Sequence, residues 1–254
     1  MHKFFLILEK LGIYWLAFFG IIIVRYFLIA GGSYWFFYSN LGKPFIKRNL
    51  RSFPPRWKSI KQDAELALFS AVFFALCAAF IISAYDSGLT RLYSVLDQYG
   101  LWYLGFSFVV VLILQDGYFY LLHRGFHHPR LFKWLHHGHH RSGDPTPWTS
   151  FAFDLPEAIL QGLFFVGIVF LMPLHFITLI ALLMTMTVWA VVTHLGFDPF
   201  PPSFFRHWFG KCLIGPTHHS IHHRKYRVHY GLYFTFWDKL LGTHDPNYEK
   251  EFLE

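Results

Sequence analysis

The sequence has little charge and almost no cysteine. Only 15% of its 254 residues are charged, against about 25% in ordinary soluble domains, which excludes disordered proteins, nucleic-acid-binding arms, coiled coils and most soluble folds. The two cysteines, Cys77 and Cys212, are far apart and form no CxxC motif, so disulfide scaffolds, thiolate zinc sites and iron–sulfur clusters are excluded. The sequence also lacks GxGxxG, CxxCH, HExxH and Glu-x-x-His motifs.

Apolar residues dominate what is present. They make up 54% of the chain, and 32 of them are phenylalanine. A helix that crosses a membrane needs about 20 mostly apolar residues, and the candidate segments are residues 13–37, 64–84, 101–122 and 158–195. The last segment is too long for one span, and Pro173 divides it, which predicts a helical hairpin. The sequence therefore predicts an all-α integral membrane protein with four or five transmembrane helices.

The charges of the connecting segments predict the orientation. Residues 43–61 contain seven lysines and arginines, whereas residues 85–100 contain only Arg91. Because cytoplasmic loops are enriched in basic residues, we expect the first segment on the cytoplasmic side and the second on the opposite side. Residues 123–156 and 196–254 then return to the cytoplasmic side, where the net charge of +7 favours anionic lipid headgroups.

Histidine is the most unusual feature. The chain has 17 histidines, more than its 15 aspartates and glutamates together. Eight of them form one HxxxH box and two HxxHH boxes, and histidines at positions i, i+3 and i+4 of a helix are neighbours. His194 ends the predicted hairpin on the same side of the membrane. The boxes are His123 with His127, His136 with His139 and His140, and His219 with His222 and His223. So many imidazoles exceed the need of one tetrahedral metal and predict two ions of a type such as iron, zinc, copper or nickel.

The boxes and the segments around them resemble a known family. Asp116 opens the segment that contains the first box, residues 145–157 read PTPWTSFAFDLPE, and residues 230–243 read YGLYFTFWDKLLGT. Together they resemble the fatty acid hydroxylase/sterol desaturase superfamily of integral-membrane di-iron oxygenases, and most of all its sterol C5-desaturase-like branch. The resemblance implies one membrane domain over residues 1–254, with N-terminal transmembrane helices in 1–115, a catalytic cap region in 116–243 and a tail in 244–254.

The resemblance also implies the metal ligands. They are His123, His127, His136, His139, His140, His194, His219, His222 and His223. His128, His137 and His218 are either further ligands or hydrogen-bonding neighbours, and we expect His2, His175, His207 and His244 to be structural. Two positions depart from the family pattern: Asp154 replaces a frequent histidine, and His229 replaces the usual asparagine.

The implied activity is hydroxylation or desaturation of a lipid C–H bond. It would use two iron ions, with zinc replacing them in a purified form, O2 as co-substrate, and electrons from an external cytochrome, ferredoxin or reductase on the cytoplasmic face. The second N–H groups of ligand imidazoles need partners, and the candidates are Asp116, Asp144, Asp154, Asp198 and Asp238, each of which would equally suit a helix cap or a salt bridge. A histidine-rich membrane metal carrier without redox catalysis is the alternative. Arg25 lies within a predicted span and either snorkels or binds a lipid headgroup.

Overall fold

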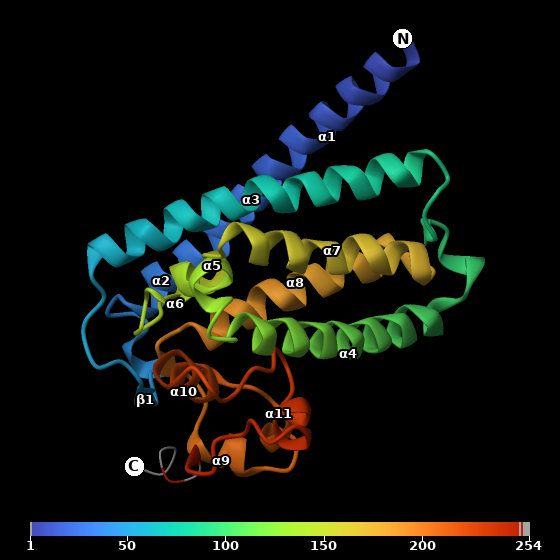
Figure 1. Ribbon diagram of the computed structural model, residues 1–254. Helices are drawn as coiled ribbons and strands as arrows, with labels where there is room; N and C mark the ends of the chain where they lie inside the picture. The colour runs from blue at the N-terminus through green and yellow to red at the C-terminus, as the bar shows by residue number, and fades with distance from the viewer. Residues whose placement is uncertain (1, 249, 251–254) are drawn as a thin grey trace.

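The computed structural model describes residues 2–248 and 250, and it is built mainly from helices (Figure 1). The long helices are α1 (His2–Tyr26), α3 (Trp57–Asp86), α4 (Leu101–Phe126), α7 (Leu155–Leu171) and α8 (Phe176–Thr193). The short helices are α2 (Gly32–Phe37), α5 (Phe132–Leu135), α6 (His137–His140), α9 (Pro202–Arg206), α10 (Pro216–Lys225) and α11 (Phe236–Leu240). The short helices after α4 gather at one end of the bundle of long helices.

Within the described residues, four helices are long and apolar enough to cross a membrane: Leu8–Phe37, Trp57–Asp86, Leu101–Phe126 and Phe176–Thr193. Helix α7 is apolar but shorter. Together with α8 it forms the predicted hairpin, and Pro173 lies in the turn between them. The outward side chains of the first candidate span, such as Leu16 at 63% exposed and Leu28 at 69%, are apolar, as expected of a surface that contacts lipid.

The bundle packs in a simple order. Helix α1 lies against α3, α3 against α7, and α4 against both α7 and α8. Small residues on α3, including Ala75 and Ala79, are completely buried and allow close helix approach. The turn between α2 and α3 and the segment after α8 are tied together by an antiparallel pair of two-residue strands, β1 (Arg48–Asn49) and β4 (Phe197–Asp198).

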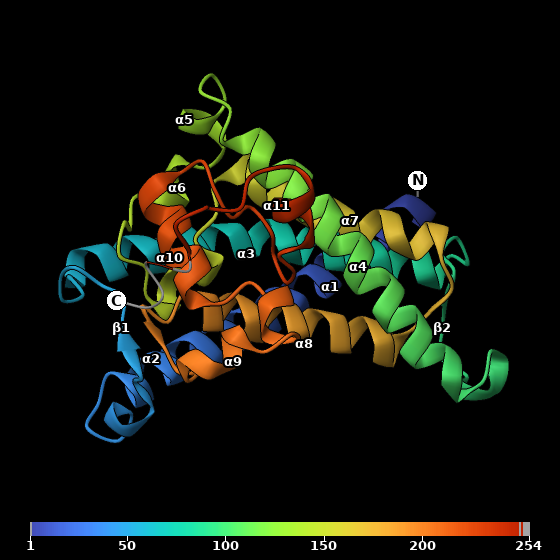
Figure 2. The same cartoon turned by 90° about the horizontal axis from the view of Figure 1, so that it is seen from below.

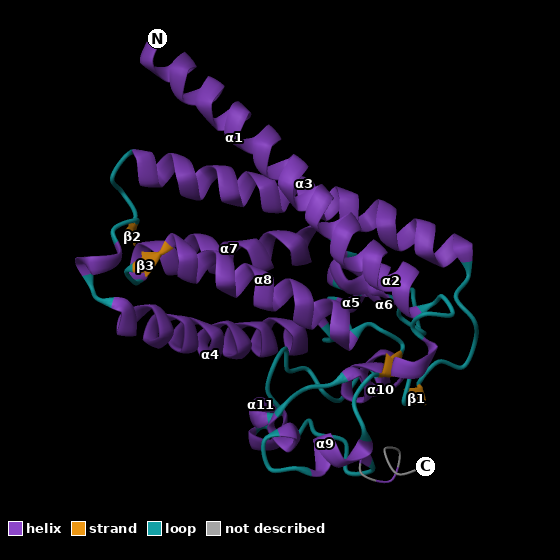
Figure 3. Cartoon of the chain, turned by 180° about the vertical axis from the view of Figure 1, so that it is seen from behind, coloured by secondary structure: helices purple, strands orange, loops and turns teal. Residues whose placement is uncertain are grey.

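A second short pair, β2 (Leu92–Tyr93) and parallel β3 (Leu174–His175), closes the opposite end of the bundle. Viewed from behind, β1 and α10 lie at one end and β2 and β3 at the other (Figure 3). The expectation of helices alone is therefore right for every long element but omits these two strand pairs. Loop 43–61 and the histidine boxes share one end of the molecule, as the alternation of spans predicts.

Candidate metal centre

Four separate elements bring the histidine boxes together. His123 is on the last turn of α4 and His127 caps that helix, while His139 and His140 are on α6. His194 caps the end of α8. The third box is on α10, which lies beside α6 when the molecule is seen from below (Figure 2). The end of the helical bundle thus holds a compact set of imidazoles.

The imidazoles form two groups, and within each group the potential ligand atoms lie within 4.8 Å of one another. The first histidine group is His123, His127, His136, His140 and His222, and the second is His139, His194, His219 and His223. All nine histidines expected as ligands are in these groups. In each HxxHH box, the i and i+4 histidines join one group and the i+3 histidine joins the other, because i+3 and i+4 positions differ by about 100° around a helix.

Backbone carbonyl groups orient most of these rings. The Nδ1 atoms of five of them lie 2.6–3.2 Å from a carbonyl oxygen, so the Nδ1–H group donates and Nε2 keeps its lone pair. The pairs are His123 with Tyr230, His139 with Ala152, His194 with Ala190, His222 with Val228, and His223 with Ser142. Outer hydrogen bonds of this kind fix the tautomer that binds a metal through Nε2.

The Nε2 atoms point at one another. That of His194 lies 2.9 Å from Nε2 of His219 and 3.3 Å from Nε2 of His139, and those of His140 and His222 are 3.1 Å apart. Where Nδ1 carries the proton in both rings, as in His194 and His139, neither Nε2 has a proton to donate, and the two lone pairs repel. In the first group, Nε2 of His123 and of His136 is buried without a hydrogen-bond partner among the described residues. Both observations fit cations held between the rings.

Burial keeps the imidazoles neutral. The nine side chains range from buried to half-buried, and desolvation lowers the pKa of His139 to about 4 and that of His194 to about 3. Neutral imidazole is the form that binds a metal. At neutral pH the two groups therefore offer nitrogen lone pairs without first having to lose protons.

One carboxylate contacts a ring directly, and the sequence analysis missed it. Oε2 of Glu157 lies 2.7 Å from Nδ1 of His136, both side chains are 1% exposed, and Oε1 accepts a hydrogen bond from Gln161. Glu157 is not part of a Glu-x-x-His motif. The available signal was its position: it is the one acidic residue within the apolar helix α7, where an ionisable side chain usually has a specific function.

The five aspartates proposed as imidazole partners accept hydrogen bonds from other groups in the described residues, chiefly from backbone N–H groups. Asp116 accepts from the backbone N–H groups of residues 232–234, and Asp238 accepts from those of residues 230 and 231. Asp144 accepts from residues 52 and 53, Asp154 accepts from Gly138, and Asp198 accepts from the Thr217 hydroxyl. These carboxylates hold the loops that carry the boxes, because backbone carbonyls already occupy the ring N–H groups.

The neighbouring histidines lie elsewhere. His128 and His137 are exposed. His218 is buried in a third group with His229 and His244. Nδ1 of His218 accepts the Gly215 backbone N–H at 3.1 Å, so its proton is on Nε2. This is the reverse of the tautomer found in the first two groups, and it disfavours metal binding by His218.

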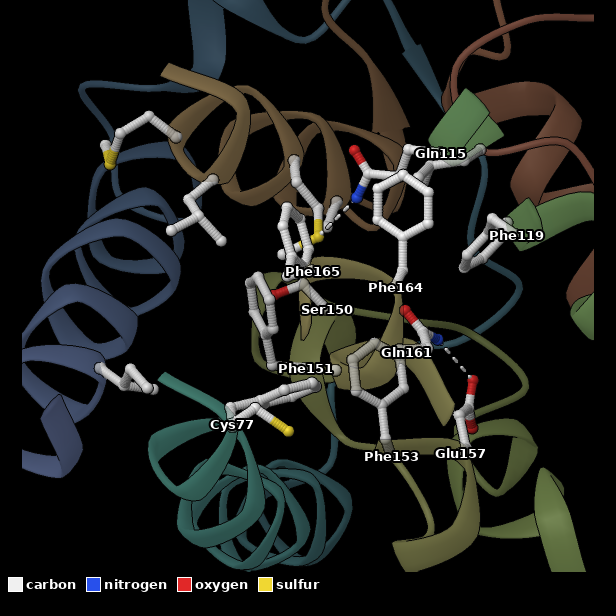
Figure 4. Close-up of a pocket in the computed structure, with 18 of the residues that line it drawn as sticks. Cys77, Gln115, Phe119, Ser150, Phe151, Phe153, Glu157, Gln161, Phe164 and Phe165 are labelled. Carbon is white, nitrogen blue, oxygen red and sulfur yellow. Dashed lines mark hydrogen bonds between the residues drawn. The ribbon is translucent and has the colours of Figure 1, made fainter. Parts of the chain in front are cut away.

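A cavity of about 500 Å³ extends from the two groups into the helical bundle. Its wall includes His123 and His136 of the first group and His139, His194 and His219 of the second. The rest is mostly apolar, with the rings of Phe151, Phe153, Phe164 and Phe165 around it and the amides of Gln115 and Gln161 among them (Figure 4). Volume and lining are typical of a site for a small apolar ligand.

Comparisons with known proteins agree with this architecture. The Delta(7)-sterol 5(6)-desaturase ERG3B of Gibberella zeae is 28% identical over 220 residues, which are 86% of this chain and 64% of that protein. The lathosterol oxidase of Rattus norvegicus is 29% identical over 231 residues, 89% of this chain and 73% of that protein. The chain thus spans less than two thirds of the first relative's length. No solved structure matches the chain.

The model of the fatty acid hydroxylase family matches residues 108–243. That range covers more than half of the chain, and it includes all three histidine boxes, His194 and the loops that hold them. By its sequence and by its buried histidine groups, the chain belongs to the fatty acid hydroxylase family.

Proposed function

We propose that the protein is a membrane di-iron oxidoreductase that hydroxylates or desaturates a lipid C–H bond, using O2 and electrons from an external donor. The observation that carries the proposal is the shared wall: one apolar cavity touches both histidine groups. A bound apolar molecule would therefore lie beside both. The names of the relatives, which act on sterols, support a lipid substrate of the sterol or fatty-acyl type.

We infer that the nine histidines of the first and second groups are the metal ligands, five for one ion and four for the other. Iron, or zinc in its place, suits an all-imidazole site. Bound iron would supply the activation of O2 that no amino-acid side chain can provide. The chain's own residues hold the rings in the required tautomer, chiefly through backbone carbonyls and through Glu157.

The cavity's own contribution is to position the substrate and exclude water. Its phenylalanine rings offer apolar contacts in the same cavity whose wall includes histidines of both groups. An apolar chain or ring bound there keeps one C–H bond beside the histidine groups. Hydroxylation and desaturation both begin with removal of one hydrogen, so the choice between them depends on this placement.

We also propose that the histidine end faces the cytoplasm, where the electron donor docks. The basic segment 43–61 is attached to that end through the pairing of β1 with β4 and through hydrogen bonds from the backbone of residues 52 and 53 to Asp144. Basic loops lie on the cytoplasmic side. A cytochrome, ferredoxin or reductase with an acidic face would be attracted to this surface.

The test compares lipids in cells that express the intact protein or its His139→Ala, His222→Ala double variant. These residues belong to different histidine groups, so the variant impairs both. His207→Ala is the matched control, because His207 is exposed and outside both groups. With a donor co-expressed, we expect a lipid that gains one oxygen or loses two hydrogens in cells with the intact protein or the control, and in no others.

A protein that binds metal but leaves every lipid unchanged, in hosts with either sterols or fatty-acyl lipids, would contradict the proposal. That outcome would favour the metal carrier. Metal analysis of the purified protein detects simple misfolding. Both the oxidoreductase and the metal carrier must retain bound metal, whereas a misfolded protein would not.

A further inference from the structure

Arg25 is a charged residue inside the apolar part of the bundle that neither the histidine groups nor the fold explains. It lies near the end of α1, within the candidate membrane span Leu8–Phe37. Its side chain lines the same cavity as the histidines. A charged side chain within a membrane span is costly, and where one is kept it usually binds or transports something.

Arg25 has no anionic partner in the part of the chain that the structure describes. Among the described residues it forms no ion pair and no hydrogen bond, and its Nε atom is buried without a partner. The carboxylate that lines the same cavity, Glu157, is already engaged by His136 and Gln161. An arginine stays protonated in proteins, so the cavity wall carries an uncompensated positive charge.

The surroundings hold the guanidinium in place. Its central carbon lies 5.6 Å from the centre of the Phe151 ring, a cation–π contact. Directly after Arg25 and Tyr26, the helix changes to a π-helical turn at Phe27–Gly31 that packs against the 3-10 turn Pro147–Phe151. Single π-helical turns within helices are frequent at functional sites. The arginine is thus oriented but not neutralised.

We propose that Arg25 binds the anionic end of the lipid substrate, a carboxylate or a phosphate, while the lipid's apolar part lies along the cavity towards the histidine groups. This inference rests on the proposed function and specifies its substrate class as an anionic amphiphile. The planar guanidinium presents a fork of N–H donors that matches the oxygens of either group. A neutral sterol would leave that charge unpaired.

Binding is tested on the purified full chain in a non-ionic detergent, by calorimetry, with dodecanoate, monododecyl phosphate and dodecanol as probes. The three share one alkyl chain and differ only in the head. We expect the wild type to bind at least one anionic probe about tenfold to hundredfold more tightly than dodecanol, as for a hydrogen-bonded charged group. The preferred anion then distinguishes a carboxylate source from a phosphate source.

Two variants separate recognition from folding. Arg25→Met should lose the preference for anions, bind dodecanol as before, and unfold at no lower temperature than the wild type, because it removes a charge without a partner. Arg25→Lys keeps the charge but loses the fork, so it should bind the anionic probe more weakly than the wild type does. Arg91→Met, at an exposed loop position, should bind all three probes like the wild type.

Equal binding of dodecanol and both anions by the wild type would overturn the inference, whatever the variants do. Unchanged anion binding by Arg25→Lys and Arg25→Met would overturn it as well. These measurements need neither O2 nor electrons. A failure here therefore leaves lipid oxidation open, and a failure to oxidise lipids leaves the binding result standing.

Discussion

The contact between Glu157 and His136 predicts how one carboxyl group controls one of the two proposed metal sites. The two side chains are buried at the cavity wall, with Oε2 2.7 Å from Nδ1, and Gln161 donates to the other carboxylate oxygen. In Glu157→Gln the amide has one oxygen acceptor where the carboxyl group has two. It can accept from His136 or from Gln161, but not from both.

The size of the effect follows from the burial of the pair. Because both side chains are 1% exposed, solvent does not replace the missing hydrogen bond. Partners of metal-binding imidazoles contribute about 10–100-fold in metal affinity, which corresponds to about 1.4–2.8 kcal/mol. We expect the upper part of this range for Glu157→Ala, which leaves the Nδ1–H group of His136 without an acceptor. Gln161→Ala keeps the carboxylate on His136 and should have a smaller effect.

The assay measures metal bound per chain against increasing concentrations of a chelator. His136 belongs to the first histidine group, whereas the second group has no contact with Glu157 among the hydrogen bonds of the described residues. Glu157→Gln should therefore lose one of two ions at a chelator concentration about 10–100-fold lower than the wild type requires. If both ions left together at the wild-type concentration, the assignment of Glu157 as a positioning residue for His136 would be refuted.

Three further results are expected. Gly138→Ala would place Cβ 2.4 Å from Oδ1 of Asp154 and disrupt the hydrogen bond from the Gly138 N–H. The free energy of unfolding, measured by chemical denaturation, should therefore fall by about 1.5–3 kcal/mol. Gly143→Ala, with open space around it, is the control and should leave the free energy of unfolding nearly unchanged. In metal-free protein, burial holds the pKa of His139 at about 4 and that of His194 at about 3, below the 6.5 of the unfolded chain. The contribution of these residues to the free energy of unfolding should thus be full above pH 6.5 and fall by about 1 kcal/mol for each residue between pH 6.5 and 5.5. A melting temperature independent of pH over this range would contradict this expectation. Removal of metal by a chelator should lower the melting temperature at neutral pH, and restoring iron or zinc should recover it, because a ligand that binds only the folded state stabilises it.

The membrane helices were predictable because hydropathy is a local property of the sequence. All four candidate spans and the hairpin around Pro173 correspond to expected segments. Their ends were less accurate. Helix α3 starts at Trp57 rather than near residue 64, because its first turns carry Lys58 and Lys61 and so continue beyond the apolar layer. Apolar runs mark the part of a helix that contacts lipid, not the whole helix.

The histidine site was predictable in its members but not in its arrangement. Spacing within each box is local, so the boxes were visible. The division of each HxxHH box between two groups depends on how α4, α6, α8 and α10 meet, which no local pattern specifies. The same holds for the partners of the rings. The chain offers many aspartates, and only the tertiary structure shows that carbonyl groups such as that of Ala152 reach the imidazoles first.

The hydrogen bond at Nδ1 of each ring determines whether its Nε2 atom offers a lone pair or a proton. A histidine with Nδ1 on a carbonyl oxygen and one with Nδ1 on a backbone N–H look alike in the sequence, yet they present a lone pair or a proton, respectively, at Nε2. His194 and His139 are of the first type, and their lone pairs face each other at 3.3 Å. His218 is of the second type, although it is the immediate neighbour of His219. Close contact between imidazoles of the first type is favourable only with a cation between them, so the tautomers separate two groups suited to metals from a third that is not.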